Sequence, residues 1–170
     1  MRFYSKDKIV PTEIDTLFRK TLIHGYVHDE GAGMLNGISG HAGLFGNVND
    51  LTKLMQMYLQ KGFYGGTQFI KPEVLAECTK YQFPELKNRR AIAFDKLDFN
   101  PKVGNGPTSA SPESFGHSGF TGTFVWVEPK YNFVYTFLSN RVYPTRDNGK
   151  ISSLNIRTEV GEQIYKMVKK

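Results

Sequence analysis

The chain has 170 residues, of which 39% are apolar, 14% aromatic and 22% charged, a composition that indicates one globular domain and excludes wholesale disorder. No apolar run approaches the roughly 20 residues needed to cross a bilayer. The only cysteine, Cys78, excludes an internal disulfide and any metal site built from several cysteines. The 13 Phe, 9 Tyr and 17 Gly favour sheets and tight turns over a helical bundle.

The charge is basic, with 22 Lys and Arg against 16 Asp and Glu, a net +6. The positive residues are spread over both ends and the middle of the chain instead of forming one stripe, so we expect no nucleic-acid partner. A solvated basic surface is the preferred interpretation, and a phosphate-bearing or acidic polymer is the alternative. No apolar segment follows Met1, so we expect no signal peptide in this stretch.

The first 48 residues are predicted to be mostly irregular. A short strand is expected at 8–10, before Pro11. The run 31–46 then holds six glycines, which is too dense for a helix or a regular strand. This predicts a loop at a functional site, anchored by the apolar residues within it. Those residues are Met34, Leu35, Ile38, Leu44 and Phe45.

Two helices are predicted next. The first is capped by Asn49 or Asp50 and ends at Gly62, with apolar residues at helical spacing between them. Gly65-Gly66 predicts a turn into a short strand at 68–70. The second helix starts at Pro72 and runs to about residue 80. Its inward side chains are expected to be Val74, Leu75 and Cys78.

The second half predicts a sheet. Residues 82–114 read as loops with one strand at 90–94, and the β-rich runs 123–128 and 133–139 flank a short turn, which predicts an antiparallel hairpin. Residues 151–168 carry Ile156, Val160, Ile164 and Val168 at a spacing of four, typical of a surface-packed helix. The expected fold class is α+β, an antiparallel sheet with packed helices and a terminal helix over it.

The strongest candidate for chemistry is the segment 116–122, Gly-His-Ser-Gly-Phe-Thr-Gly, at the entrance to this hairpin. Gly119 permits close approach to an exposed backbone, and the Ser118 hydroxyl could bind a polar group. The alternative is a glycine-rich strand entrance with an exposed histidine.

Four motifs occur in order along the chain. They are His28-Asp29-Glu30, the run 40–45 before a capped helix, the segment 116–122, and Ser139-Asn140-Arg141-Val142 with Pro144-Thr145-Arg146. In this order they resemble the motifs of the penicillin-binding-protein and β-lactamase-like serine hydrolases, on the esterase and class C side, and the resemblance runs from about Lys8 to the C-terminus.

The resemblance implies a partial transpeptidase-like fold. Residues 1–170 would be a single C-terminal fragment of that domain, divided into a cleft loop region (1–48), a helical part (49–81) and a hairpin with a terminal helix (90–170).

The resemblance also implies roles for particular residues. The family's Lys/His-Thr/Ser-Gly motif matches His117-Ser118-Gly119, with the backbone N–H of Phe120 as an oxyanion-hole donor. Ser118 would bind a substrate carboxylate or carbonyl, and His117 would tune the proton network where lysine is more usual. Substrate-binding residues on the facing loop and turn would be His28, Asp29, Glu30, His41 and Thr121.

The family's nucleophile motif, Ser-x-x-Lys, and its second motif, Tyr-x-Asn or Tyr-Ser-Asp, should precede the matched region. Only Ser5-Lys6-Asp7-Lys8 has the first spelling, in a polar stretch not expected to be helical, and no Tyr-x-Asn precedes the glycine-rich loop. We therefore expect the C-terminal part of a longer enzyme acting on a small-molecule or cell-wall ester or amide, inactive alone. Its partners would be the remaining N-terminal part of the domain and other copies, through an uncovered sheet edge. The resemblance implies an extracytoplasmic location for the complete enzyme.

Three alternatives remain open. His24 and His28, near Asp29, Glu30 and His41, could indicate a metal site, but Gly25 argues against a helix there. Polar loop histidines are therefore preferred, and neither a metal nor a cofactor is expected. Trp126 and the many tyrosines could indicate a non-catalytic binding module, although core packing explains them better. The chain could also be the β-lactamase-like tail of a family 3 glycosidase fusion, of the β-N-acetylhexosaminidase type.

Overall fold

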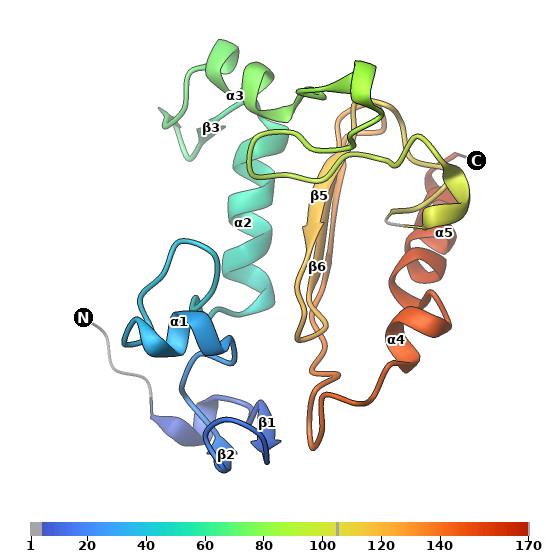
Figure 1. Cartoon of the computed structure of the whole chain (residues 1–170). Helices are drawn as coiled ribbons and strands as arrows, with labels where there is room; N and C mark the ends of the chain where they lie inside the picture. Colours follow the sequence, from blue (N-terminus) through green and yellow to red (C-terminus); the bar gives the residue numbers. More distant parts are fainter. Residues whose placement is uncertain (1–4, 105, 170) are drawn as a thin grey trace.

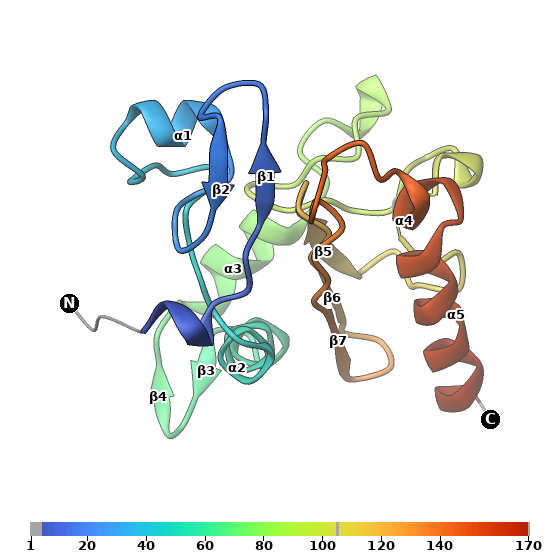
Figure 2. The same ribbon diagram turned by 90° about the horizontal axis from the view of Figure 1, so that it is seen from below.

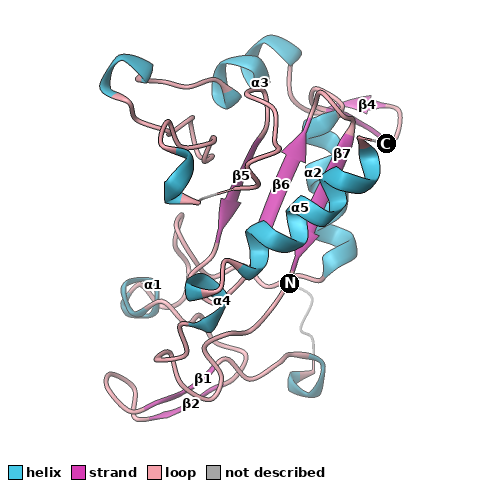
Figure 3. Ribbon diagram, turned by 90° about the vertical axis from the view of Figure 1, so that its right-hand side faces the viewer, coloured by secondary structure: helices cyan, strands magenta, loops and turns pink. Residues whose placement is uncertain are grey.

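The computed structural model describes residues 5–104 and 106–169. A three-stranded antiparallel sheet has the strand order β5 (Phe115–Ser118), β6 (Phe124–Glu128), β7 (Phe133–Phe137). It is covered by α2 (Val48–Leu59) on one face and by α5 (Ile156–Val168) on the other (Figure 1). Figure 3 shows α5 in front of the sheet and α2 behind it. This confirms the α+β class. The elements are η1 (Lys6–Lys8), β1 (Glu13–Asp15), β2 (Thr21–Ile23), α1 (Glu30–Met34), α2 (Val48–Leu59), β3 (Phe63–Tyr64), β4 (Thr67–Gln68), α3 (Pro72–Thr79), η2 (Pro84–Leu86), η3 (Pro101–Val103), β5 (Phe115–Ser118), β6 (Phe124–Glu128), β7 (Phe133–Phe137), α4 (Lys150–Ser153) and α5 (Ile156–Val168).

The predicted hairpin is confirmed as β6 and β7, and β5 pairs with the other side of β6. Alternate residues of β6 point to opposite faces of the sheet. Val127 packs with Met55 of α2 in one core cluster, and Trp126 packs with Phe124 and Tyr135 in a second cluster that α5 covers through Ile164. The sheet is thus buried on both faces. Its edge strands are β5, which is bridged at Gly116 to Asp95, and β7.

Both predicted helices are confirmed, with differences at their ends. The cap of α2 is Asn47, whose side-chain oxygen accepts from the Asp50 N–H at 3.0 Å, two residues earlier than the first predicted cap. In α3, Leu75 is buried as expected, whereas Val74 is exposed and Cys78 is only half-buried. Fewer side chains of α3 are therefore buried than the apolar pattern predicts.

Two predicted strands are wrong. Residue 8 is the last residue of the 3-10 turn η1 and residues 9–10 form no strand, so the first strand is β1, which pairs with β2. Between 90 and 94, Ala93 has φ +62°, which interrupts an extended run, so only an isolated bridge from Arg90 to Asp95 forms.

The terminal helix is split into α4 and α5 because Asn155 lies in the left-handed region, with φ +48°. The expected apolar stripe is also partly wrong, since Val160 and Val168 are exposed while Gly161 and Tyr165 are buried. The Tyr165 hydroxyl donates to Glu128 at 2.6 Å, which turns this side of the helix toward the sheet.

The glycine-rich run begins with a short helix that its composition argued against. In α1, the Asp29 side chain accepts from the Ala32 N–H at 2.8 Å and caps the helix. A Cβ on Gly33 would clash with the Arg19 guanidinium, so a glycine inside this helix permits a tertiary contact.

The apolar side chains expected to anchor this loop are all exposed, and Leu44 is 101% exposed. Polar contacts hold the loop instead, chiefly the bond from His41 to Asp29.

The β1–β2 hairpin and α1 lie beyond the end of the sheet at which β5 finishes (Figure 1 and Figure 2). The Ile14 N–H donates to the Pro144 carbonyl at 3.0 Å, which connects β1 to the loop between β7 and α4. Within the described ranges, no helix is long and apolar enough to span a membrane.

Candidate functional site

The turn after β5, residues 118–123, is the centre of the candidate site. The Gly119 N–H donates to the Thr123 carbonyl at 2.8 Å, and the Gly122 N–H donates to the Gly119 carbonyl at 3.0 Å, which closes a tight turn. Phe120 is at the tip of this turn and 60% exposed. Its N–H has no hydrogen-bond acceptor among the described residues. The turn therefore presents a free main-chain donor at the edge of the sheet.

His117 lies on the α2 side of the sheet, opposite Val125. Its Nδ1 is 2.9 Å from the Ser118 carbonyl, which only accepts, and its Nε2 is 3.3 Å from Nη1 of Arg90, which only donates. These two contacts match the donor and acceptor roles of the tautomer that carries its proton on Nδ1. Arg90 in turn pairs with Asp95 at 2.7 Å, so the orientation of the ring is fixed by a chain of polar contacts.

Ser118 lies on the other side, where it lines a cavity of about 180 Å³ between the end of β5 and the start of α5. Its hydroxyl has no partner among residues 5–104 and 106–169. The cavity is otherwise lined by Val103, Gly104, Phe124, Ile151, Ser152, Asn155, Arg157 and Thr158. The cavity is small and is lined partly by polar groups, which include the Arg157 guanidinium.

Arg157 is a candidate site residue that sequence reasoning missed. Its guanidinium donates weakly to the carbonyls of Gly119 (3.4 Å) and Thr123 (3.3 Å), so it contacts the same turn. Burial, with the nearby positive charge of Arg141, lowers the pKa of Arg157 from its usual value. In the sequence it is one basic residue among 22, and only the docking of α5 on the sheet distinguishes it.

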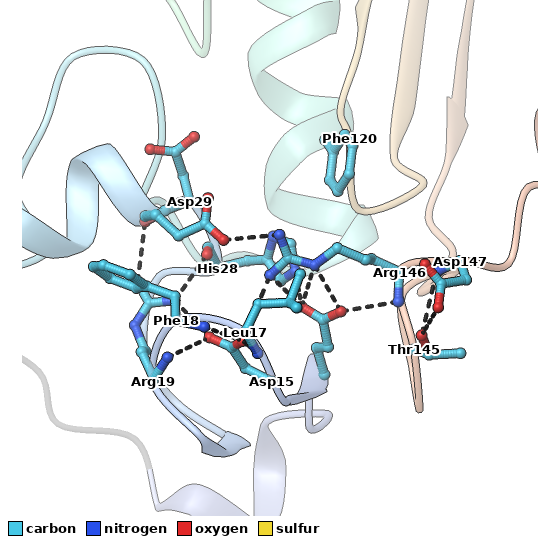
Figure 4. Close-up of polar contacts among 12 residues, drawn as sticks. Asp15, Leu17, Phe18, Arg19, His28, Asp29, Phe120, Thr145, Arg146 and Asp147 are labelled. Atoms are coloured by element: carbon cyan, nitrogen blue, oxygen red, sulfur yellow. Dashed lines mark hydrogen bonds and ion pairs between the residues drawn. The ribbon is translucent and has the colours of Figure 1, made fainter.

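A buried ion cluster lies beneath the turn (Figure 4). Glu13, which is 3% exposed, accepts from Nε of Arg146 at 2.9 Å, from Nη2 at 2.8 Å and from Nε2 of His28 at 2.7 Å. Nη1 of Arg146 donates to Glu30 at 2.7 Å. Burial opposes ionisation of Glu13, but the hydrogen bonds from Arg146 and His28 hold its pKa below the usual value. Residues from both ends of the chain thus share one charge network.

Asp15 supports this cluster from the adjoining turn. Its carboxylate accepts three backbone N–H groups, from Leu17, Phe18 and Arg19, at 2.9 to 3.0 Å. These bonds, with the one from Phe18 the largest cause, lower the pKa of Asp15 to about 2. Arg19, placed by this turn, donates to the carbonyls of His28 and Asp29 at 3.0 and 3.1 Å. Asp15 therefore acts on His28 through Arg19, which holds the main chain at His28 and Asp29.

Asp29, His41 and Ser39 form a second, exposed chain of contacts. Nε2 of His41 is 2.8 Å from Asp29, and Nδ1 is 2.7 Å from the Ser39 hydroxyl. Hydrogen bonds from Ala32 N–H and His41 lower the pKa of Asp29. These are the residue types of a charge-relay triad, but the His41 side chain is 57% exposed and its contacts join the glycine-rich loop to the start of α1. Their observed effect is to hold the loop.

The structure brings the two sequence-predicted segments together at one point. The His28 ring stacks on the Phe120 ring, with centroids 5.6 Å apart and planes inclined by 26°. Glu30 reaches Arg146, whereas Asp29 and His41 bind each other, and the Thr121 carbonyl accepts from the Arg141 N–H at 2.9 Å. His28 and Glu30 therefore have internal partners, and His28 supports the candidate turn from below.

The residues considered for other kinds of site lie apart. His24 contacts the Ile9 carbonyl at 2.6 Å while His28 contacts Glu13, so the two rings have separate partners. No set of three metal-ligating side chains comes together in the described part of the chain. Trp126 is fully buried between the sheet and α5, so it belongs to the core.

Comparisons with known proteins agree on one family. The family model described as Beta-lactamase matches residues 9–155. A protein of Salmonella enteritidis PT4 named "Putative D-alanyl-D-alanine carboxypeptidase" is 31% identical over 164 residues, which cover 89% of this chain and 37% of that protein. A protein of the same name from Salmonella newport SL254 is 31% identical over 166 residues, with the same coverage. The chain thus spans 37% of the length of these curated relatives.

Among solved structures, a penicillin-binding protein homolog from Caulobacter crescentus matches with a TM-score of 0.42 and 23% identity, over 53% of this chain and 24% of that one. Because the family match covers most of its length, the chain belongs to the β-lactamase family, the penicillin-binding-protein and β-lactamase-like serine hydrolases.

Proposed function

We propose that this chain supplies one wall of the active site of an acyl-transferring serine hydrolase that cleaves an ester or an amide. The observation that carries the proposal is the Phe120 N–H, which lies on an exposed turn without an acceptor among the described residues. A preorganised main-chain donor of this kind stabilises the oxyanion that develops in acyl transfer. His117 and Gly119 complete the wall. The polar contacts of His117 orient its ring, and Gly119 permits the tight turn because a Cβ there would clash with the Thr123 hydroxyl.

Ser118 and Arg157 support a substrate that carries a carboxylate. Both line the cavity of about 180 Å³ beside the turn, where a hydroxyl and a guanidinium offer donors to an anionic oxygen. The name of the curated relatives denotes a carboxypeptidase acting on D-alanyl-D-alanine, a peptide end with a free carboxylate. A cell-wall peptide is therefore the substrate class that we propose, with an extracytoplasmic location for the complete enzyme. Asp29, His41 and Thr121 would border the same site from the loop and the turn.

We propose that the nucleophile and its activating base lie outside this segment. The single Ser-x-x-Lys spelling, at 5–8, falls on an exposed 3-10 turn with Ser5 as its N-cap, not at the start of a buried helix. Since the chain spans 37% of its curated relatives, these proteins have ample sequence beyond the match to carry the missing groups.

The isolated chain is accordingly expected to show no turnover of nitrocefin or of a chromogenic ester above background, because its oxyanion donor has no acyl-enzyme to stabilise. The full open reading frame containing this segment should form an acyl-enzyme with a β-lactam, detectable as a mass increase of the intact protein. Failure of that protein to acylate would overturn the proposed function.

The variants Ser5→Ala and Ser39→Ala serve as controls for the isolated chain. Turnover that either substitution abolishes would show a nucleophile within the segment and contradict this assignment.

We also propose that the rest of the domain covers the apolar side chains of the glycine-rich loop and the free edge of β7. Met34, Ile38 and Leu44 are more than 70% exposed on this loop, and an unpaired strand edge is a template for association. The isolated chain should therefore sediment as a concentration-dependent mixture of monomer and oligomer. Leu44→Lys should shift the mixture toward monomer, and a monomer at every concentration would count against a covered face.

A further inference from the structure

We propose that Glu13, His28, Arg141 and Arg146 form a clamp that positions the oxyanion donor of Phe120. These four residues are called the Phe120 clamp below. The inference rests on the proposed function, since it assigns a task to side chains that would not themselves touch the substrate. The clamp is a closed circuit of contacts that begins and ends at Phe120 and leaves only its N–H unengaged.

One half of the circuit holds the ring of Phe120 from below. The His28 ring stacks on it at 5.6 Å, and Nε2 of His28 is 2.7 Å from the Glu13 carboxylate. Glu13 is held in turn by Nε and Nη2 of Arg146 at 2.9 and 2.8 Å, in a two-pronged contact that fixes the direction of the carboxylate. The position of the His28 ring is therefore set by an ion pair and not by packing alone.

The other half holds the ring and the carbonyl of Phe120 from the opposite side. The guanidinium of Arg141 lies 4.3 Å from the Phe120 ring centroid, and its Nε donates to the Phe120 carbonyl at 2.7 Å. Nη1 of the same side chain donates to the Arg146 carbonyl at 2.8 Å. Arg146 thus holds both halves, one through its side chain and the other through its main chain.

Burial makes this circuit stiff. Glu13 is almost fully buried, and the side chains of His28 and Arg146 are 9% and 20% exposed. In such an environment, hydrogen-bonded charges interact more strongly than they do at the surface. The contacts also connect β1 to the loop after β7, two regions 133 residues apart in sequence. The turn that carries Phe120 is therefore fixed to the β1–β2 hairpin and the segment before α1, which lie beyond the end of the sheet (Figure 4).

A positioning role follows from the geometry that an oxyanion donor requires. Such donors act at about 2.7–3.1 Å from the charged oxygen, and a displacement of about 1 Å can cost roughly 100-fold in rate. The Phe120 N–H belongs to the peptide group whose carbonyl, that of Gly119, accepts from the Gly122 N–H at 3.0 Å. Because the Phe120 ring and the following carbonyl are held as well, this peptide group has little freedom to rotate. The clamp would therefore affect the transition state more than it affects substrate binding.

The test uses Glu13→Gln in the isolated chain and in the full open reading frame. In the isolated chain, the amide NMR signals of Gly119, Phe120 and Thr121 should shift and broaden while those of α2 and α5 stay in place. In the full protein, kcat for a chromogenic ester should fall 10- to 100-fold with KM changed less than threefold. Glu162→Gln is the matched control, because Glu162 also accepts from a side chain and a backbone N–H, of Thr108 and Ser109, but lies on α5 outside the clamp.

A second variant keeps the test valid if Glu13→Gln does not fold. Arg141→Gln removes the contacts to the Phe120 ring and carbonyl and the bond to the Arg146 carbonyl, but it leaves the side-chain contacts between Glu13 and Arg146 in place. It should therefore give the same NMR changes and the same loss of kcat. If either variant folds, moves the Phe120 signals and keeps the wild-type kcat, the clamp is not a positioning device and this inference alone fails. If the wild-type full protein does not acylate, the proposed function fails first and takes the clamp's catalytic role with it.

Discussion

Replacing Gly116 with alanine should unfold the chain or reduce its stability by about 3 kcal/mol or more. Gly116 pairs with Trp126 across β5 and β6. An added Cβ would clash with the Val125 carbonyl oxygen and lie 2.5 Å from Cε3 of Trp126. Neither neighbour can yield, because one is backbone of the central strand and the other is a fully buried ring. Against a total stability of about 5–15 kcal/mol, this loss is a large fraction.

Urea denaturation followed by fluorescence measures the effect directly, since Trp126 is the only tryptophan and lies at the contact. Gly46→Ala is the matched control, because a Cβ there meets nothing within 4 Å. If the two variants unfold at the same urea concentration, the close approach of β5 to Trp126 is wrong. The result bears on the site as well, because Gly116 directly precedes His117 and its pairing with Trp126 fixes the register of β5 on β6.

The sheet and its covering helices could be predicted because their signals are local. The β-rich runs of the hairpin, the cap before α2 and Pro72 at the start of α3 each act within a few residues. Some of the misses have causes that are not local. Glycine content argues against α1, which is stabilised by the local Asp29 cap and by the contact of the more distant Arg19 with Gly33. The apolar residues of the same loop read as core, because nothing in the sequence distinguishes a buried apolar side chain from an exposed one.

The candidate site was predictable to a similar degree. The segment 117–120 stands out by composition and by resemblance, and the structure places it at an exposed edge beside His28. What sequence reasoning missed are the partners that other elements supply. Glu13 belongs to no motif and Arg146 is one residue of the last motif, so the sequence does not predict their pairing across 133 residues. Arg157 is likewise placed beside Ser118 only by the docking of α5.

The second large effect concerns Lys96, whose burial should make the chain more stable as the pH rises from 8 to 10. Lys96 is 3% exposed, and its Nζ donates to the Glu113 carbonyl at 3.1 Å and lies 5.1 Å from the Tyr81 ring centroid. Burial lowers the pKa of Lys96 from 10.5 to about 8, although the charges of Glu113 and Glu128 oppose this.

The sign follows from proton binding. Between pH 8 and 10.5 the unfolded chain keeps the Lys96 proton while the folded chain releases it, so unfolding takes up a proton and stability increases with pH. The full difference amounts to about 3 kcal/mol. Above pH 10 the trend should reverse, because burial raises the pKa of Tyr135 to about 12 and an unfolded tyrosine ionises first.

The test measures the urea midpoints of the wild type and of Lys96→Met by Trp126 fluorescence at intervals from pH 7 to 10.5. The difference between the two proteins isolates the contribution of Lys96 to the pH dependence of stability. The wild-type free energy of unfolding should rise by about 2 kcal/mol or more up to pH 10, while Lys96→Met should show no such rise, since methionine keeps the stem in the core without a titrating group. Equal slopes for the two proteins would show that Lys96 keeps its proton in the folded state, with the acidic side chains around it outweighing the cost of burial.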